Sequence, residues 1–126
     1  MPITYRIDRD KRLIIETWTG DIFARDLAAY WQSYLANAEV LQIRRTVVDL
    51  LASAIRFTGD ELSSLIESIV LPALNGREWT TALVVAGDSV EFGVSRQYQV
   101  FAERYSEDSI FDNMADAEKW ICGKTW

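Results

Sequence analysis

The sequence has no histidine and only one cysteine, Cys122, among its 126 residues. Without histidine a Ser-His-Asp triad is excluded, and one cysteine supplies neither an internal disulfide nor the Cys and His ligands usual at zinc sites. The sequence also lacks a GxxxxGK loop for nucleotide phosphates. We therefore expect a protein that binds rather than catalyses, with no cofactor or metal. Cys122 then reads as a small, semi-buried residue.

Proline and glycine are also scarce, with two and six copies respectively. This leaves no room for a flexible linker, and the length suits one domain over residues 1–126. No apolar run approaches the length of a membrane span, and Met1–Asp10 is too mixed in charge for a signal peptide. We expect a cytoplasmic, bacterial-type domain with no integral membrane segment.

Basic residues are outnumbered, 13 against 19 carboxylates, which gives a formal charge of −6. The clusters at residues 6–12 and 44–45 are short, and the first is interrupted by Asp8 and Asp10. A nucleic-acid or anionic-lipid surface requires a larger basic face. Nucleic acid is therefore not an expected partner.

Hydrophobic patterning predicts an α/β fold. Residues 3–8 and 12–19 alternate apolar and polar side chains around a turn at residues 9–11, which is typical of a β-hairpin. Apolar strands are expected near residues 46–50, 80–86 and 109–111, and helical patterns follow them. A further helix follows the hairpin. This alternation predicts a five-stranded mixed sheet with four main helices.

Capping residues mark the helix starts. Thr58 and Glu61 form a Thr-x-x-Glu capping box, in which each side chain binds a free backbone N–H. The other expected caps are Asp21, Asp88 or Ser89, and Asp112 or Asn113. Pro72 is expected to kink or end the helix that follows Thr58. Gly93, early in a helix, suggests a close packing contact.

Several short segments together resemble a known group of small domains. They are Val47-Val48-Asp49-Leu50, Glu91-Phe92-Gly93, Ile110-Phe111-Asp112, Ala115, Ala117 and Trp120-Ile121. In this order they resemble the SpoIIAA-like group, which is related to STAS domains. The resemblance covers nearly the whole chain and implies successive β-α units that act by binding.

The same resemblance raises the possibility of a phosphorylation switch. In antagonist-type STAS domains a serine at the start of the second helix is phosphorylated. Counting from Asp49 places the serine pair on Thr58 and Gly59, with the acceptor position on Gly59, which has no hydroxyl. Thr58 stays as the candidate phosphoacceptor, and its alternative role is the helix cap.

Two binding functions are open at this point. The first is a regulatory module that acts through protein partners as a homodimer. The second is a carrier or sensor of a lipid-like small molecule, because other relatives of the group resemble CRAL-TRIO proteins, which hold an apolar ligand between sheet and helix. Its candidate lining residues are Leu65, Ile69, Tyr98 and Phe101.

Large aromatic residues are numerous, with five each of Trp, Tyr and Phe. Several stand at turns or element ends rather than on a helix stripe. Large apolar side chains that a small core does not cover are favoured at interfaces. Such positions therefore predict a homodimer interface, and they are Trp18, Trp79, Val90, Phe92 and Trp126.

Overall fold

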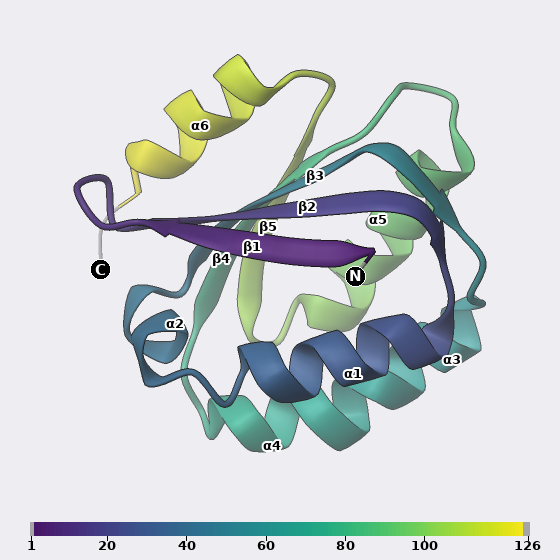
Figure 1. The fold of residues 1–126 in the computed structure, drawn as a ribbon, viewed down its shortest axis with the longest axis horizontal. Coiled ribbons are helices and arrows are strands. Elements are labelled where there is room, and N and C mark those ends of the chain that lie inside the picture. Colours follow the sequence, from purple (N-terminus) through teal and green to yellow (C-terminus); the bar gives the residue numbers. More distant parts are fainter. Residues whose placement is uncertain (1, 125–126) are drawn as a thin grey trace.

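A computed structural model describes residues 2–124, and a five-stranded sheet forms its centre (Figure 1). The strands are β1 (Ile3–Asp8), β2 (Leu13–Ile22), β3 (Arg45–Ile55), β4 (Trp79–Val84) and β5 (Ser106–Phe111). They lie in the order β1-β2-β3-β4-β5, with β1 antiparallel to β2 and the other neighbours parallel. The predicted mixed sheet is confirmed.

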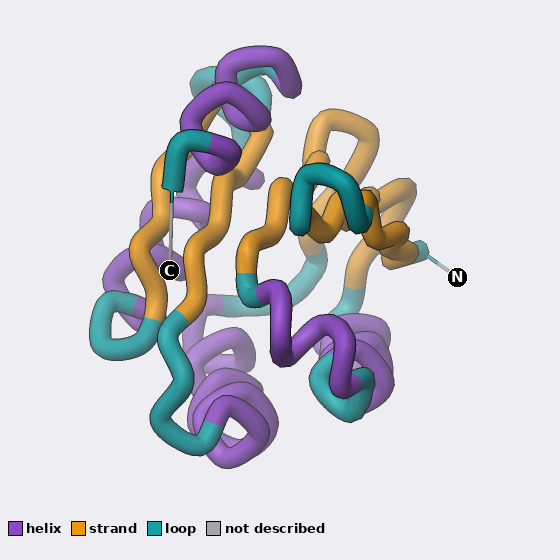
Figure 2. The backbone as a smooth tube through the Cα atoms, turned by 90° about the vertical axis from the view of Figure 1, so that its left-hand side faces the viewer, coloured by secondary structure: helices purple, strands orange, loops and turns teal. Residues whose placement is uncertain are grey.

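Helices cover the two faces of this sheet unequally. They are α1 (Ala24–Tyr34), α2 (Ala38–Ile43), α3 (Gly59–Leu65), the π-helix η1 (Ile66–Val70), α4 (Leu71–Leu74), α5 (Val90–Ala102) and α6 (Met114–Cys122). The helices α1, α3 to α4 and α5 pack on one face, and α6 packs on the other (Figure 1, Figure 2). Four helices have seven or more residues, as predicted. No helix within residues 2–124 is long and apolar enough to cross a membrane.

Strand alternation separates two groups of buried side chains. Ile14 and Trp18 of β2, with Glu16 between them, face the side of the sheet that is covered by α1, α3 to α4 and α5. Leu13 and Ile15 face α6, where they meet Ala117 and Ile121. The sheet therefore carries a large core on one face and a small one on the other.

β3 is longer than the sequence predicts. Residues 52–55, beyond the predicted end at residue 50, continue the strand and pair with residues 19–22 of β2 after an irregularity between Thr17 and Thr19. The pairing is disrupted only locally at such an irregularity, so both strands extend past it. β5 likewise begins three residues before the predicted residue 109 because residues 106–108 pair with Trp79–Thr81.

The expected caps are confirmed at three of the four helix starts. Thr58, Ser89 and Asn113 each accept a backbone N–H bond from the first turn of α3, α5 and α6. The prediction for α1 is wrong. Phe23 stands at its start and donates its N–H to the carboxylate of Asp26, 2.8 Å away, while Asp21 pairs with Arg56.

The segment around Pro72 departs from a regular helix. η1 precedes α4, and the N–H of Leu71 donates to the carbonyl of Ile66, five residues back. Pro72 then stands in the first turn of α4, where its missing N–H is tolerated. The helix ends at Leu74, two residues after the proline, and Asn75 takes a left-handed conformation with φ 49°.

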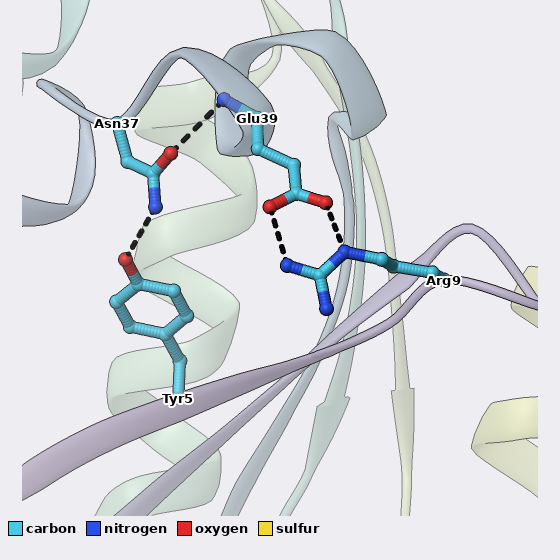
Figure 3. Close-up of polar contacts among 4 residues, drawn as sticks. All are labelled: Tyr5, Arg9, Asn37 and Glu39. Carbon is cyan, nitrogen blue, oxygen red and sulfur yellow. Dashed lines mark hydrogen bonds and ion pairs between the residues drawn. The ribbon is translucent and has the colours of Figure 1, made fainter.

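The short helix α2 is absent from the sequence prediction. Asn37 caps it and also donates a 2.9 Å hydrogen bond to the hydroxyl of Tyr5 on β1 (Figure 3). Glu39 forms a two-point ion pair with Arg9 of the hairpin turn, at 2.7 and 2.9 Å (Figure 3). Because these contacts are long-range in sequence, local patterning gives no sign of the helix.

Arg45 connects the turn of the N-terminal hairpin to the end of α6. It is buried at the start of β3, and its guanidinium donates to the carbonyls of Lys11 and Arg12 in the hairpin turn. It also donates to the carbonyls of Ile121 and Lys124 at the end of α6, at 3.3 and 2.7 Å. The planar guanidinium thus links the hairpin turn and the end of α6 through four backbone carbonyls.

Candidate functional site

A cavity lies within the larger core, between the sheet and the helices α1, α3 to α4 and α5. The volume of this cavity that the centre of a water molecule can reach is about 80 Å³. A single water needs roughly 10–15 Å³ by this measure, so there is room for several waters or one small organic molecule. Its lining residues include Glu16, Trp18, Trp31, Tyr34, Thr46, Phe57, Trp79, Val94, Ser95, Tyr98 and Tyr105.

Aromatic rings form much of the wall. Seven lining residues are aromatic, and they come from β2, α1, the turn before α3, β4 and the region of α5: Trp18, Trp31, Tyr34, Phe57, Trp79, Tyr98 and Tyr105. Aromatic rings offer wide apolar faces with little rotamer freedom to lose. They give the cavity a rigid wall that suits a flat or apolar ligand.

Glu16 lies on the sheet side of the cavity, and 4% of the residue is exposed. Its two carboxylate oxygens accept hydrogen bonds from Trp18 Nε1 and from the Tyr30 hydroxyl, each at 2.7 Å. Burial raises the pKa of Glu16 from 4.5 to about 7, although both hydrogen bonds favour the charged form. The cavity therefore contains a carboxyl group whose charge changes near neutral pH.

A second polar group stands at the base of the cavity. The hydroxyl of Thr46 on β3 lies 2.8 Å from the Tyr34 hydroxyl and accepts a 3.1 Å hydrogen bond from Trp79 Nε1. Burial raises the pKa of the Tyr34 hydroxyl well above its usual value, so it stays neutral. These bonds fix the rings of Tyr34 and Trp79 in place.

Ser95 of α5 presents an unsatisfied hydroxyl. The residue is 2% exposed and lines the cavity, and its Oγ has no hydrogen-bond partner within residues 2–124. Buried hydroxyls normally have a partner because burying one unpaired costs free energy. Ser95 Oγ is thus available to a polar atom inside the cavity.

Tyr98 and Tyr105 are two further lining residues with hydroxyl groups. The Tyr105 hydroxyl donates to the Tyr98 hydroxyl at 3.3 Å. Asp108 of β5 pairs with Thr81 in the sheet. Burial raises the pKa of Asp108 to about 6, although a 2.6 Å hydrogen bond from Ser106 favours the charged carboxylate. Asp108 does not itself line the cavity.

The predicted ligand-binding residues meet different outcomes. Tyr98 lines the cavity. Leu65, Ile69 and Phe101 are half-buried and pack against the core, but they are not part of the cavity wall. The helices and the turn after α5 instead contribute Leu62, Val70, Leu74, Val94 and Tyr105 to the wall. The π-turn at η1 shifts the helix phase after Leu65, so Val70 rather than Ile69 reaches the cavity wall.

The predicted interface tryptophans need correction. Trp18 and Trp79 are buried within the chain and line the cavity. The indole N–H of Trp18 donates to the Glu16 carboxylate, and that of Trp79 donates to the Thr46 hydroxyl. Neither is available to a second subunit. Phe92 is half-buried against the core, and Val90 is 68% exposed. Trp126 lies outside the described residues.

Thr58 lies at the exposed start of α3, away from the cavity wall. Its hydroxyl accepts from Glu61 N at 3.1 Å, and Thr58 N donates to the Glu61 carboxylate at 2.9 Å. The capping box is confirmed, and phosphorylation stays a prediction. Cys122 is exposed rather than semi-buried. A Cβ at Gly93 would meet nothing within 4 Å, so no packing contact explains this glycine.

Glu16 is the functional candidate that sequence reasoning missed. A signal was present, because Ile14, Glu16 and Trp18 alternate within a predicted strand and must share one face. A charged residue between two large apolar side chains on an inward face indicates a buried carboxyl. Within residues 2–124, no group of three acidic or Cys residues is placed to hold a metal ion.

Comparisons with known proteins show the fold. No protein-family model matches the sequence, and no curated protein does. Among solved structures, the chain is similar to an uncharacterised DUF3478-family protein from Shewanella loihica PV-4, described as having a SpoIIAA-like fold. The two share 17% sequence identity with a TM-score of 0.63, over 95% of this chain and 94% of the other. This chain therefore has a SpoIIAA-like α/β fold.

Proposed function

We propose that this protein is a non-catalytic binding protein that holds a small, mostly apolar molecule in the cavity between the sheet and helices α1, α3 to α4 and α5. The observation that carries the proposal is the aromatic-lined cavity itself. Ligand sites are typically concave and apolar, with a few placed polar groups. Glu16, Thr46 and Ser95 supply such groups here.

An empty cavity in the core carries a cost in stability that a ligand would offset. Protein interiors are normally close-packed, and empty space in a core costs stability because its lining atoms lose contacts. A bound molecule would restore those contacts and satisfy the free hydroxyl of Ser95. A ligand for this cavity thus stabilises the fold as well as occupying a site.

The ligand enters the cavity at the segment α3–η1–α4. Val70 of η1 and Leu62 of α3 both line the cavity. π-turns are rare and are often found at functional sites. A small movement of this segment relative to the sheet would open the cavity without breaking any strand pairing.

Tryptophan fluorescence tests the proposal, because Trp18, Trp31 and Trp79 line the cavity. We expect saturable fluorescence changes, together with a rise in melting temperature, from some members of a panel of small neutral, cationic and anionic aromatic compounds. Native mass spectrometry of the purified protein would show any retained ligand. A panel without any response, with a bare protein mass, would overturn the proposal.

Two variants on α5 locate the binding. Val94→Phe places a ring in the cavity wall, whereas Val100→Phe places the same ring on a residue that is 67% exposed. We expect Val94→Phe to weaken binding at least about tenfold and Val100→Phe to bind like the parent. Equal binding by both variants would place the ligand elsewhere.

A second proposal is self-association or binding of a protein partner at the start of α5. Val90 is 68% exposed, and the N–H of Ile55 donates to the carboxylate of Glu91, which brings the end of β3 to the same edge. Large exposed apolar side chains favour an interface. Sedimentation equilibrium should show a dimer that Val90→Asp dissociates and Val100→Asp does not. A concentration-independent monomer mass would remove the homodimer.

A further inference from the structure

Glu16 brings a negative charge into the cavity without a matching positive one. Of the described residues that line the cavity, Glu16 is the only one with an acidic or basic side chain. Its hydrogen bonds come from neutral donors, Trp18 and Tyr30. A buried carboxylate is costly unless it is paired with a cation. A positively charged group in the cavity would supply that pairing.

The aromatic wall favours the same kind of ligand. The face of an aromatic ring is electronegative, and it attracts ammonium groups most strongly where water is excluded. Seven aromatic residues line the cavity, and Trp18, which is hydrogen-bonded to Glu16, is one of them. An ammonium group near Glu16 would thus also meet aromatic faces.

Other ligand charges fit less well. A ligand carboxylate would face Glu16 without a basic side chain among the described lining residues to offset the repulsion. A neutral alcohol would fill the space but leave the charge of Glu16 unpaired. The net charge of −6 would in addition draw cations rather than anions toward the protein.

We propose that the cavity binds a small organic amine, with its ammonium group against the Glu16 carboxylate and its apolar body among the aromatic rings. This inference rests on the binding function proposed above and names its ligand class. The free hydroxyl of Ser95 on α5 gives a second polar contact for a ligand that carries a hydroxyl or an additional N–H.

Three probes of one shape test the ligand charge: benzylamine, benzyl alcohol and benzoate. At pH 8, calorimetric titration should show benzylamine binding at least about tenfold more tightly than benzyl alcohol, with benzoate weakest. Lowering the pH to about 5.5 protonates Glu16 and should weaken benzylamine severalfold, while benzyl alcohol stays unchanged.

Among the described residues, other titratable groups surround the cavity. The hydroxyls of Tyr30 and Tyr34 on α1 and of Tyr98 on α5 have raised pKa values, so they stay neutral between pH 5.5 and 8. Asp108 on β5 does titrate in this range. Asp108→Asn should therefore keep the preference for benzylamine and its pH dependence.

Glu16→Gln should abolish both the preference for benzylamine and its pH dependence. Its amide can accept from Trp18 and donate to Tyr30, so the fold is retained, and the pH series on the parent protein needs no variant at all. Benzyl alcohol or benzoate binding as well as benzylamine at pH 8 would overturn the amine inference and leave the binding function standing. No binding of these probes, with binding of other neutral compounds, would also overturn the amine inference alone. No binding of any compound would overturn both.

Discussion

Replacing Glu16 by glutamine should make the protein more stable at alkaline pH and remove much of its pH dependence. Burial raises the pKa of Glu16 from 4.5 to about 7 in the folded state. Glutamine imitates the protonated side chain, because it can accept from Trp18 Nε1 and donate to the Tyr30 hydroxyl at the observed 2.7 Å positions. The charge is removed while the hydrogen bonds are kept.

The sign follows from proton binding. Between about pH 4.5 and pH 7 the unfolded chain has lost the Glu16 proton and the folded chain still holds it. Stability therefore falls as pH rises through this window, and the full cost is present above it. At about 1.4 kcal/mol per pH unit, the raised pKa costs about 3 kcal/mol at pH 8.

Urea unfolding of the parent and of Glu16→Gln at pH 5, 6, 7 and 8 measures this cost. The two stabilities should be similar near pH 5 and diverge to about 3 kcal/mol in favour of the variant at pH 8. Asp108, whose pKa is raised to about 6, is present in both proteins, so its contribution cancels. Glu103→Gln, which changes an exposed glutamate, should follow the parent. Parallel pH profiles for parent and Glu16→Gln would refute the reasoning.

Three further substitutions test individual elements. Thr58→Ala should lower the free energy of unfolding by about 1 kcal/mol through loss of the capping box with Glu61, as measured in urea. A variant that is equally stable but loses a signalling phenotype would revive phosphorylation at Thr58. Gly93→Ala should raise it by about 0.5–1 kcal/mol, since the added Cβ meets open space in a helix; a destabilised variant would contradict this. Arg45→Lys should cost roughly 2 kcal/mol and speed amide exchange in α6, because one ammonium group cannot reach all the carbonyls that the guanidinium binds. Unchanged exchange in α6 would show that Arg45 does not hold it.

The sequence was sufficient for the fold class because its signals are local. The alternation in the hairpin, the apolar strand predicted at residues 80–86 and the caps at Thr58, Ser89 and Asn113 all act over a few residues. The structure has that strand at Trp79–Val84. Elements that depend on distant partners were missed. α2 depends on contacts of Asn37 and Glu39 with the hairpin, and the second half of β3 depends on pairing with β2 beyond a bulge.

The cavity was predicted in kind but not in its residues. The carrier was one of two functions left open by the sequence, and of its four proposed lining residues only Tyr98 is in the wall of the cavity. A regular helical period cannot anticipate the π-turn after Leu65, which brings Val70 rather than Ile69 to the cavity wall. Trp18 and Trp79 were misjudged because their buried hydrogen-bond acceptors lie on other side chains, and only the folded chain shows those distances.

The sheet divides the buried interior into two compartments that differ in how completely they are packed. The compartment under α6 is filled by aliphatic side chains such as Leu13, Val47 and Ile121. The opposite compartment carries the cavity and the charge of Glu16. Since the strands are shared, rigidity supplied by the filled side holds the open side in shape. Substitutions that reshape the cavity toward new ligands can therefore accumulate on one side while the other side preserves the frame.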